Sequence, residues 1–101
     1  MKHALALAVL GLAGASGPVF AQAELAKQKN CLACHATDKK LVGPSYKDVA
    51  AKYKGDKDAA AKLAKKIREG GVGVWGQVPM PANPQVNEQE AASLAKWVLS
   101  Q

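Results

Sequence analysis

The feature that most constrains this chain is the spacing of its only two cysteines, Cys31-Leu32-Ala33-Cys34, with His35 directly after them. Such a pair is typical of zinc sites, of thioredoxin-like redox pairs or, with the histidine, of covalent haem attachment. A zinc site would need two further ligands, and His3 is the only other cysteine or histidine in the chain. A thioredoxin-like pair lies on a βαβ scaffold, for which this sequence has no pattern.

Haem attachment explains the spacing and the histidine together. One helical turn places the thiols of Cys31 and Cys34 beside one edge of a porphyrin, and His35 can then reach the iron from one face. The sequence therefore predicts one haem c, covalently held through Cys31 and Cys34, with His35 as a metal ligand.

The N-terminal residues have the pattern of an export signal. Lys2 precedes an apolar run over residues 4–13, and Val19-Phe20-Ala21 forms a small-x-small cleavage pattern that recurs at Ala23. A membrane anchor is the alternative, but Gly and Pro interrupt the run well short of the roughly 20 residues that span a bilayer. We expect a signal peptide over residues 1–21, with cleavage after residue 21 or 23, and a periplasmic domain over residues 22–101. Export would favour a disulfide between two cysteines, but the adjacent histidine favours haem.

Composition limits both the partners and the core. The chain has 14 Lys and Arg against 8 Asp and Glu, with the basic residues spread along it. This balance favours acidic partners, whereas nucleic acid would require a concentrated basic stripe with interleaved aromatics. A domain this small buries little apolar surface and commonly needs a staple such as a metal or disulfide. Beyond Phe20 its aromatic side chains are Tyr46, Tyr53, Trp75 and Trp97.

Apolar residues recur at helical spacing, so we expect an all-α fold with little or no sheet. A first helix is expected over residues 23–34, and Asp56 is expected to cap the third. Gly70 and Gly71 should end that third helix, and Asn87 with Glu90 forms a capping-box-like start for the last. The expected buried faces are Tyr46, Val49, Ala50 and Tyr53, then Ala60, Leu63, Ala64 and Ile67, then Ala91, Leu94, Ala95 and Val98.

Residues 70–86 are rich in Gly and Pro, and an irregular stretch of this length usually has a function. It holds Met80, the only methionine besides Met1, between Pro79 and Pro81. A neutral thioether favours reduced haem iron and raises its potential. A flexible surface loop is the alternative for the segment, and a lysine is the alternative ligand, although it must first lose a well-solvated proton. We therefore predict His35 and Met80 as the axial pair.

Over residues 22–101 the chain resembles the small bacterial class I cytochromes c of the c-551/c-552 kind. The resemblance implies a small single domain with helices wrapped around one covalently attached haem. It rests on Cys31-Leu32-Ala33-Cys34-His35, Val42-Gly43-Pro44, Gly73-Val74-Trp75-Gly76, Val78-Pro79-Met80-Pro81 and Ala95-Lys96-Trp97-Val98-Leu99.

The resemblance also implies roles for residues around the haem. The Pro44 carbonyl would accept a hydrogen bond from the far nitrogen of His35, and Trp75 and Lys66 would lie near a haem propionate. Asn83 would hydrogen-bond toward Met80. The alternatives are a core role for Trp75, a surface role for Lys66 and a turn role for Asn83. The chain departs from the common Met-Pro-Pro-Asn pattern, with Ala82 and one residue more before the last helix, which affects the Asn83 contact most.

The function implied is that of a periplasmic single-electron carrier, not an enzyme, with no catalytic residues of its own. A small haem peroxidase would need an open iron face and a polar distal group, and a sensor would need an output domain. By resemblance, the partners are redox proteins, with a cytochrome bc complex upstream and a nitrite reductase, terminal oxidase or peroxidase downstream. We expect a monomer with no stable membrane insertion. Docking is expected at an apolar haem edge formed by Leu32, Ala33, Leu41, Val42, Val78, Pro79 and Pro81, with Lys27, Lys39, Lys40 and Lys47 outside it.

Overall fold

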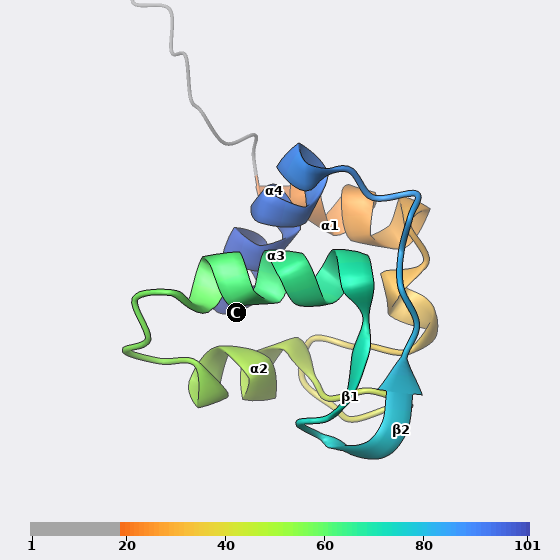
Figure 1. Ribbon diagram of the computed structural model, residues 1–101. Coiled ribbons are helices and arrows are strands. Elements are labelled where there is room, and N and C mark those ends of the chain that lie inside the picture. Colours follow the sequence, from red (N-terminus) through yellow and green to blue (C-terminus); the bar gives the residue numbers. More distant parts are fainter. Residues whose placement is uncertain (1–18) are drawn as a thin grey trace, which may run out of the picture.

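The computed structural model of the chain describes residues 19–101, and helices make up most of them (Figure 1). The expected fold with mostly helices and little sheet is confirmed, with one short two-stranded hairpin. In chain order the elements are α1 (Val19–Gln28), the 3₁₀ helix η1 (Cys31–Ala33), α2 (Tyr46–Lys52), α3 (Ala59–Glu69), β1 (Gly71–Gly73), β2 (Gly76–Met80) and α4 (Glu88–Leu99).

The first helix is shorter at its C-terminal end than the prediction of residues 23–34. It ends at Gln28, and Asn30 then adopts a left-handed conformation with φ 66°. Asparagine tolerates this conformation better than most residues and often ends a helix there. The chain resumes as the single 3₁₀ turn η1, so a change of direction separates α1 from the Cys31–His35 motif.

Helices α2 and α3 follow the predicted apolar spacing, and Tyr46, Val49 and Leu63 are buried. The cap of α3 differs from the prediction. Asp58, not Asp56, occupies the N-cap position, while an Asp56 carboxylate oxygen accepts the Asp58 backbone N–H at 2.8 Å. Its other carboxylate oxygen lies 2.8 Å from Lys62 Nζ, so Asp56 supports the start of the helix from two residues before the N-cap.

The last helix is the centre of the packing. The Asn87 side chain accepts the Glu90 N–H at 2.8 Å and the Glu90 side chain accepts the Asn87 N–H at 3.0 Å, which confirms the predicted capping box. Helix α4 contacts α1, α2 and α3. Its residues Ala91 and Leu94 join Ala26 of α1 in one core cluster, and Ala95 joins a second cluster with α2 and α3.

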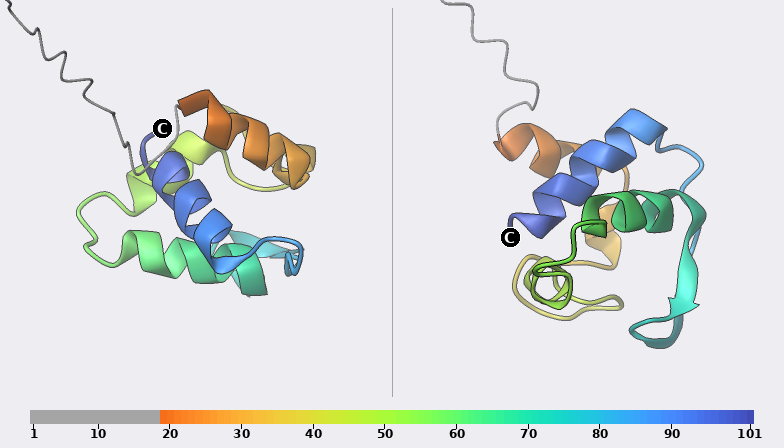
Figure 2. Two further views of the ribbon diagram at one scale, coloured as in Figure 1. Left: turned by 90° about the horizontal axis from the view of Figure 1, so that it is seen from above. Right: turned by 60° about the vertical axis from the view of Figure 1, so that its left-hand side comes forward.

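The segment after α3 contains a hairpin that the apolar pattern does not predict. Strands β1 and β2 pair antiparallel, with Gly71 opposite Met80 and Gly73 opposite Gly76. Glycines predominate in β1, so the segment shows no alternation of apolar and polar side chains. In Figure 1 and in the right-hand view of Figure 2, the hairpin lies at the lower end of the molecule, while α1 and the start of α4 lie at the upper end.

Most of the predicted signal peptide lies outside the described residues, which include only Val19–Ala21 of it, in the first turn of α1. The cleavage site stays a prediction. Within residues 19–101, no helix has the length and apolar character needed to cross a membrane.

Candidate functional site

An apolar cavity opens between the helices and the hairpin, and seven of the eight predicted site residues line it. These are Cys31, Cys34, His35, Pro44, Lys66, Trp75 and Met80. Most of the remaining wall is apolar, with Val49, Leu63 and Leu94 at the helix side and Val72, Val74 and Val78 from the hairpin. Residues that are far apart in the sequence therefore meet around one space.

His35 is held in place by residues that follow it closely in the chain. Its Nδ1 lies 2.7 Å from the Pro44 carbonyl oxygen. Because a carbonyl can only accept, Nδ1 carries the proton and Nε2 keeps a free lone pair. The ring stacks on Tyr46, with centroids 5.5 Å apart. A side chain on Gly43 would place its Cβ 2.5 Å from His35 Cε1, so glycine is needed for this close approach.

The two cysteines lie beside this histidine as free thiols. Backbone bonds hold the turn, because the His35 N–H donates to the Cys31 carbonyl at 3.0 Å and the Gly43 N–H to the Cys34 carbonyl at 2.8 Å. Burial raises the pKa of the Cys31 thiol, and the nearby Cys34 adds to this effect. A thiol of this kind stays protonated at neutral pH in the polypeptide alone.

Met80 ends β2 and is half-buried. On its N-terminal side it is held by the pairing of β2 with Gly71. On the other side, the Asn83 backbone N–H donates to the Arg68 carbonyl at 3.0 Å. Gly70 makes room for this loop, since a Cβ there would lie 2.7 Å from Ala82 N.

Trp75 and Lys66 reach the cavity from the hairpin and from α3. Lys52 Nζ of α2 lies 5.4 Å from the centroid of the Trp75 ring, within the range of a cation–π contact. Lys66 packs against Gly71, where a Cβ would collide with its Nζ. Both residues line the cavity and carry N–H donors.

Asn83 differs from its expected place, because it does not line the cavity and its amide has other partners. Its Nδ2 donates to the Ile67 carbonyl at 2.7 Å, with a longer contact of 3.4 Å to the Pro81 carbonyl. Its Oδ1 accepts from Gln85 Nε2 at 3.1 Å. Among the described residues no bond joins Asn83 to Met80.

Three residues absent from the predicted site set also shape the cavity. Tyr46 and Gly43 contact the His35 ring, and Trp97 meets Tyr46 edge to face at 5.0 Å between centroids. The signal for Tyr46 was its place on an apolar helix face, which indicates burial and not a role beside the histidine. Gly43 stands in the Val42-Gly43-Pro44 motif, where a glycine before Pro44 already suggests a close approach.

The residues present fit a large flat ligand with an apolar body and a few polar groups. The buried Tyr46 Oη and Trp97 Nε1 atoms have no hydrogen-bond partner within the described part of the chain. Buried polar atoms normally have partners, and both residues line this cavity. Two thiols, an imidazole with a free nitrogen and a thioether complete a donor set suited to haem.

A model of the family described as Cytochrome c matches residues 21–101 of this chain. The chain belongs to the cytochrome c family. It is 57% identical over 101 residues to cytochrome c-552 of Hydrogenobacter thermophilus, covering 99% of this chain and 98% of that protein. It is 60% identical over 77 residues to cytochrome c-551 of Pseudomonas aeruginosa, covering 76% of this chain and 73% of that protein.

A structural relative supports the same assignment. The crystal structure of wild-type Nitrosomonas europaea cytochrome c552 matches with a TM-score of 0.76 and 54% identity, covering 77% of this chain and 96% of that one. These matches confirm the resemblance to monohaem c-551/c-552 electron carriers. The cofactor of this family is a c-type haem attached through two cysteines, and Cys31 and Cys34 are the two cysteines here.

Proposed function

We propose that this chain is a periplasmic single-electron carrier whose one haem is attached through Cys31 and Cys34 and ligated axially by His35 and Met80. The observation that carries the proposal is that all four side chains line one apolar cavity, with the His35 ring oriented by the Pro44 carbonyl at 2.7 Å. Family membership supports the cofactor, and the cavity supports this choice of ligands.

Each of these residues has a separate task. Haem, when bound, supplies an iron that gains and loses one electron. The Pro44 carbonyl holds the proton on His35 Nδ1 and makes Nε2 a better ligand. Pro79 and Pro81 restrict the backbone on both sides of Met80, whose thioether favours the reduced state. With protein ligands on both faces there is no position for a substrate, so we propose a carrier and not an enzyme.

The neighbouring residues act on the polar edge of the ligand or on the loop. Trp75 and Lys66 line the cavity and carry N–H donors suited to a carboxylate, so we keep them as partners of a haem propionate. Asn83 holds the loop after Met80 through its bonds to Ile67 and Arg68. Its role is therefore to support the loop that carries Met80.

The location and partners follow from the chain as a whole. Residues 1–21 have the pattern of a signal peptide, so we propose export to the periplasm with residues 22–101 as the working domain. Exposed apolar residues Leu32, Leu41, Val42 and Val78 stand among exposed lysines, of which the nearest in sequence are Lys39 and Lys40. This surface suits brief docking of acidic redox proteins, for which we propose a cytochrome bc complex as donor and a nitrite reductase, oxidase or peroxidase as acceptor.

Replacement of Met80 tests the ligand assignment and the carrier function together. In the ferric protein we expect a weak sulfur-to-iron band in the near red and slow cyanide binding. Met80→Ala should abolish the band, speed cyanide binding, lower the reduction potential and raise peroxidase turnover, because the thioether no longer fills the sixth position. Gln77→Ala is the control, since this exposed residue lies in the same strand but does not line the cavity.

Two results would contradict the proposal. A native ferric protein that lacks the band and turns over peroxide rapidly would show that the iron has an open face. A Met80→Ala protein with an unchanged spectrum and potential would instead make a lysine the sixth ligand.

A further inference from the structure

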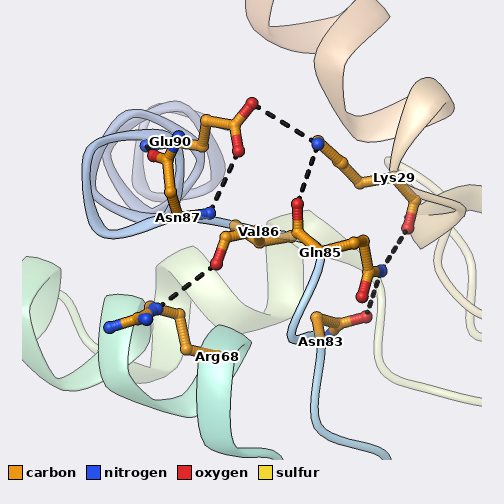
Figure 3. A network of polar contacts seen from close by, with 7 residues as sticks. All are labelled: Lys29, Arg68, Asn83, Gln85, Val86, Asn87 and Glu90. Atoms are coloured by element: carbon orange, nitrogen blue, oxygen red, sulfur yellow. Dashed lines mark hydrogen bonds and ion pairs between the residues drawn. The ribbon is translucent and has the colours of Figure 1, made fainter.

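A reciprocal pair of hydrogen bonds joins the end of α1 to the loop after Met80 (Figure 3). Lys29 Nζ donates to the Gln85 carbonyl at 2.9 Å, and Gln85 Nε2 reaches toward the Lys29 carbonyl at 3.5 Å. Lys29 Nζ also lies 3.5 Å from a Glu90 carboxylate oxygen. The Lys29 side chain is 21% exposed, but Gln85 is exposed, so water competes with these bonds and each contributes modestly.

The same Gln85 amide also orients Asn83 (Figure 3). Its Nε2 donates to Asn83 Oδ1 at 3.1 Å, which turns the Asn83 amide nitrogen toward the Ile67 carbonyl of α3, 2.7 Å away. The loop is thereby bonded to α1 through Gln85 and to α3 through Asn83. Met80 lies between this double attachment and its own pairing with Gly71.

Gln85 belongs to the stretch where this chain has one residue more than the common family pattern. The longer connection adds backbone that must be held in one conformation, and each added degree of freedom favours opening. A side chain that bonds to both Lys29 and Asn83 removes that freedom. The Gln85 side chain therefore holds the loop at two points.

We propose that Gln85 is a positioning residue for Met80, which acts with Lys29 and through Asn83 to keep the loop closed. The bridge links the helix that leads into the cysteine motif with the loop that carries the opposite ligand. Its loss raises the fraction of molecules in which Met80 has left the iron. This inference rests on the proposed role of Met80 as the sixth ligand.

The rate of cyanide binding to the ferric holoprotein measures that open fraction, because cyanide at low concentration binds only when the sixth position is free. Gln85→Ala should speed binding about fivefold, the factor expected for the loss of one ordinary hydrogen bond. Lys29→Met keeps the aliphatic stem but removes the bond to the Gln85 carbonyl, and it should act in the same direction. Gln89→Ala, a change of the same residue type at an exposed site in α4, should leave the rate unchanged.

The near-red band shows whether Met80 is the ligand, and the cyanide rate shows whether Gln85 positions it. If the native protein and Gln85→Ala both show the band and bind cyanide at the same rate, Gln85 does not position Met80, while the ligand assignment stands. If the native protein has no such band, Met80 is not the ligand and both proposals are overturned. Equal acceleration by Gln85→Ala and Gln89→Ala would also overturn the inference, since the effect would not depend on the bridge.

Discussion

The two sides of the cavity are held by different kinds of contact. On the His35 side the bonds join near neighbours, because the Pro44 carbonyl and the Gly43 backbone meet the His35 ring within one short stretch of chain. On the Met80 side they join distant residues, and the bonds between Lys29 and Gln85 span 56 positions. A local arrangement can form as soon as its own segment is ordered, whereas the Met80 loop needs α1 and α3 already in place.

This difference predicts that the Met80 side opens first. Local opening free energies vary widely within a protein, and segments with few buried apolar contacts open most easily. Residues 72–79 are all exposed, and the bonds of the loop end on the last turns of α1 and α3. The His35 side, by contrast, stacks on buried Tyr46.

The largest effect is expected for Gly70→Ala, on the Met80 side. Gly70 has φ 72° and ψ −166°, a conformation that is essentially reserved for glycine. A Cβ there would also meet backbone atoms of Met80, Pro81 and Ala82. Strain and overpacking together should lower the free energy of unfolding by about 3 kcal/mol or more, measured by urea unfolding of the holoprotein, and should weaken the near-red band.

Gly55→Ala is the matched control for this change. Gly55 also has a positive φ, of 84°, but a Cβ there would have nothing within 4 Å. It should therefore show only the conformational cost, about 1 kcal/mol. Equal losses for Gly55→Ala and Gly70→Ala would mean that the contact with the Met80 loop has no energetic importance.

A smaller effect is expected for Gly43→Ala, the corresponding change on the His35 side. Gly43 is not among the glycines with positive φ, so the cost is steric. The new Cβ would lie 2.5 Å from His35 Cε1 and 2.9 Å from Nδ1, and overpacking of this kind costs about 1–3 kcal/mol. Urea unfolding should show this loss. Exchange of the His35 ring N–H, followed by NMR, should become faster as the bond to Pro44 is disturbed.

The near-red band separates the two glycine changes. Because Gly43 contacts the His35 ring and not the Met80 loop, Gly43→Ala should leave the band in place. A band lost as completely as in Gly70→Ala would show that the two sides move together and would remove the distinction between them.

The sequence predicts the features that depend on local contacts, and it does not predict those that depend on contacts between distant residues. The capping box of α4 needs only Asn87 and Glu90, which are three positions apart, and Gly70 ends α3 for a reason that is visible in the sequence. The cofactor likewise follows from one short motif. Such features depend on contacts within a few residues, which a sequence displays directly.

Other features could not be predicted because they depend on neighbours brought together by the fold. Residues 27–29 are good helix formers, so nothing before Asn30 indicates that α1 stops at Gln28. The hairpin is rich in glycine, so its strands show no alternation of apolar and polar side chains that would predict them. The chemistry of the Asn83 amide allows a bond to Met80 or to Ile67, and the choice depends on Gln85 and Arg68, which the fold brings beside it.

The smallest effect is expected for Glu90→Gln, which tests the ion pair between Lys29, just after α1, and Glu90 of α4. The Asn87 N–H, and to a lesser degree Lys29, hold the pKa of Glu90 below its ordinary value of 4.5. A carboxylate whose pKa is lower in the folded protein stabilises the fold fully at pH values above its pKa in the unfolded chain. This contribution is lost as the pH falls through its pKa in the folded protein. Glu90→Gln should therefore be less stable than the native protein at neutral pH, with the difference shrinking as urea unfolding is repeated at pH values below about 4.5.

Lys29→Met shows which of the two partners carries this dependence. The Asn87 N–H is the larger cause of the lowered pKa, and that bond survives in Lys29→Met. This variant should therefore keep most of the acid dependence that Glu90→Gln loses, while both variants lose the ion pair between Lys29 and Glu90. If Lys29→Met instead flattens the acid dependence as fully as Glu90→Gln does, the ion pair between α1 and α4 dominates the titration. The capping bond from Asn87 to Glu90 would then contribute less to the acid dependence than the ion pair with Lys29.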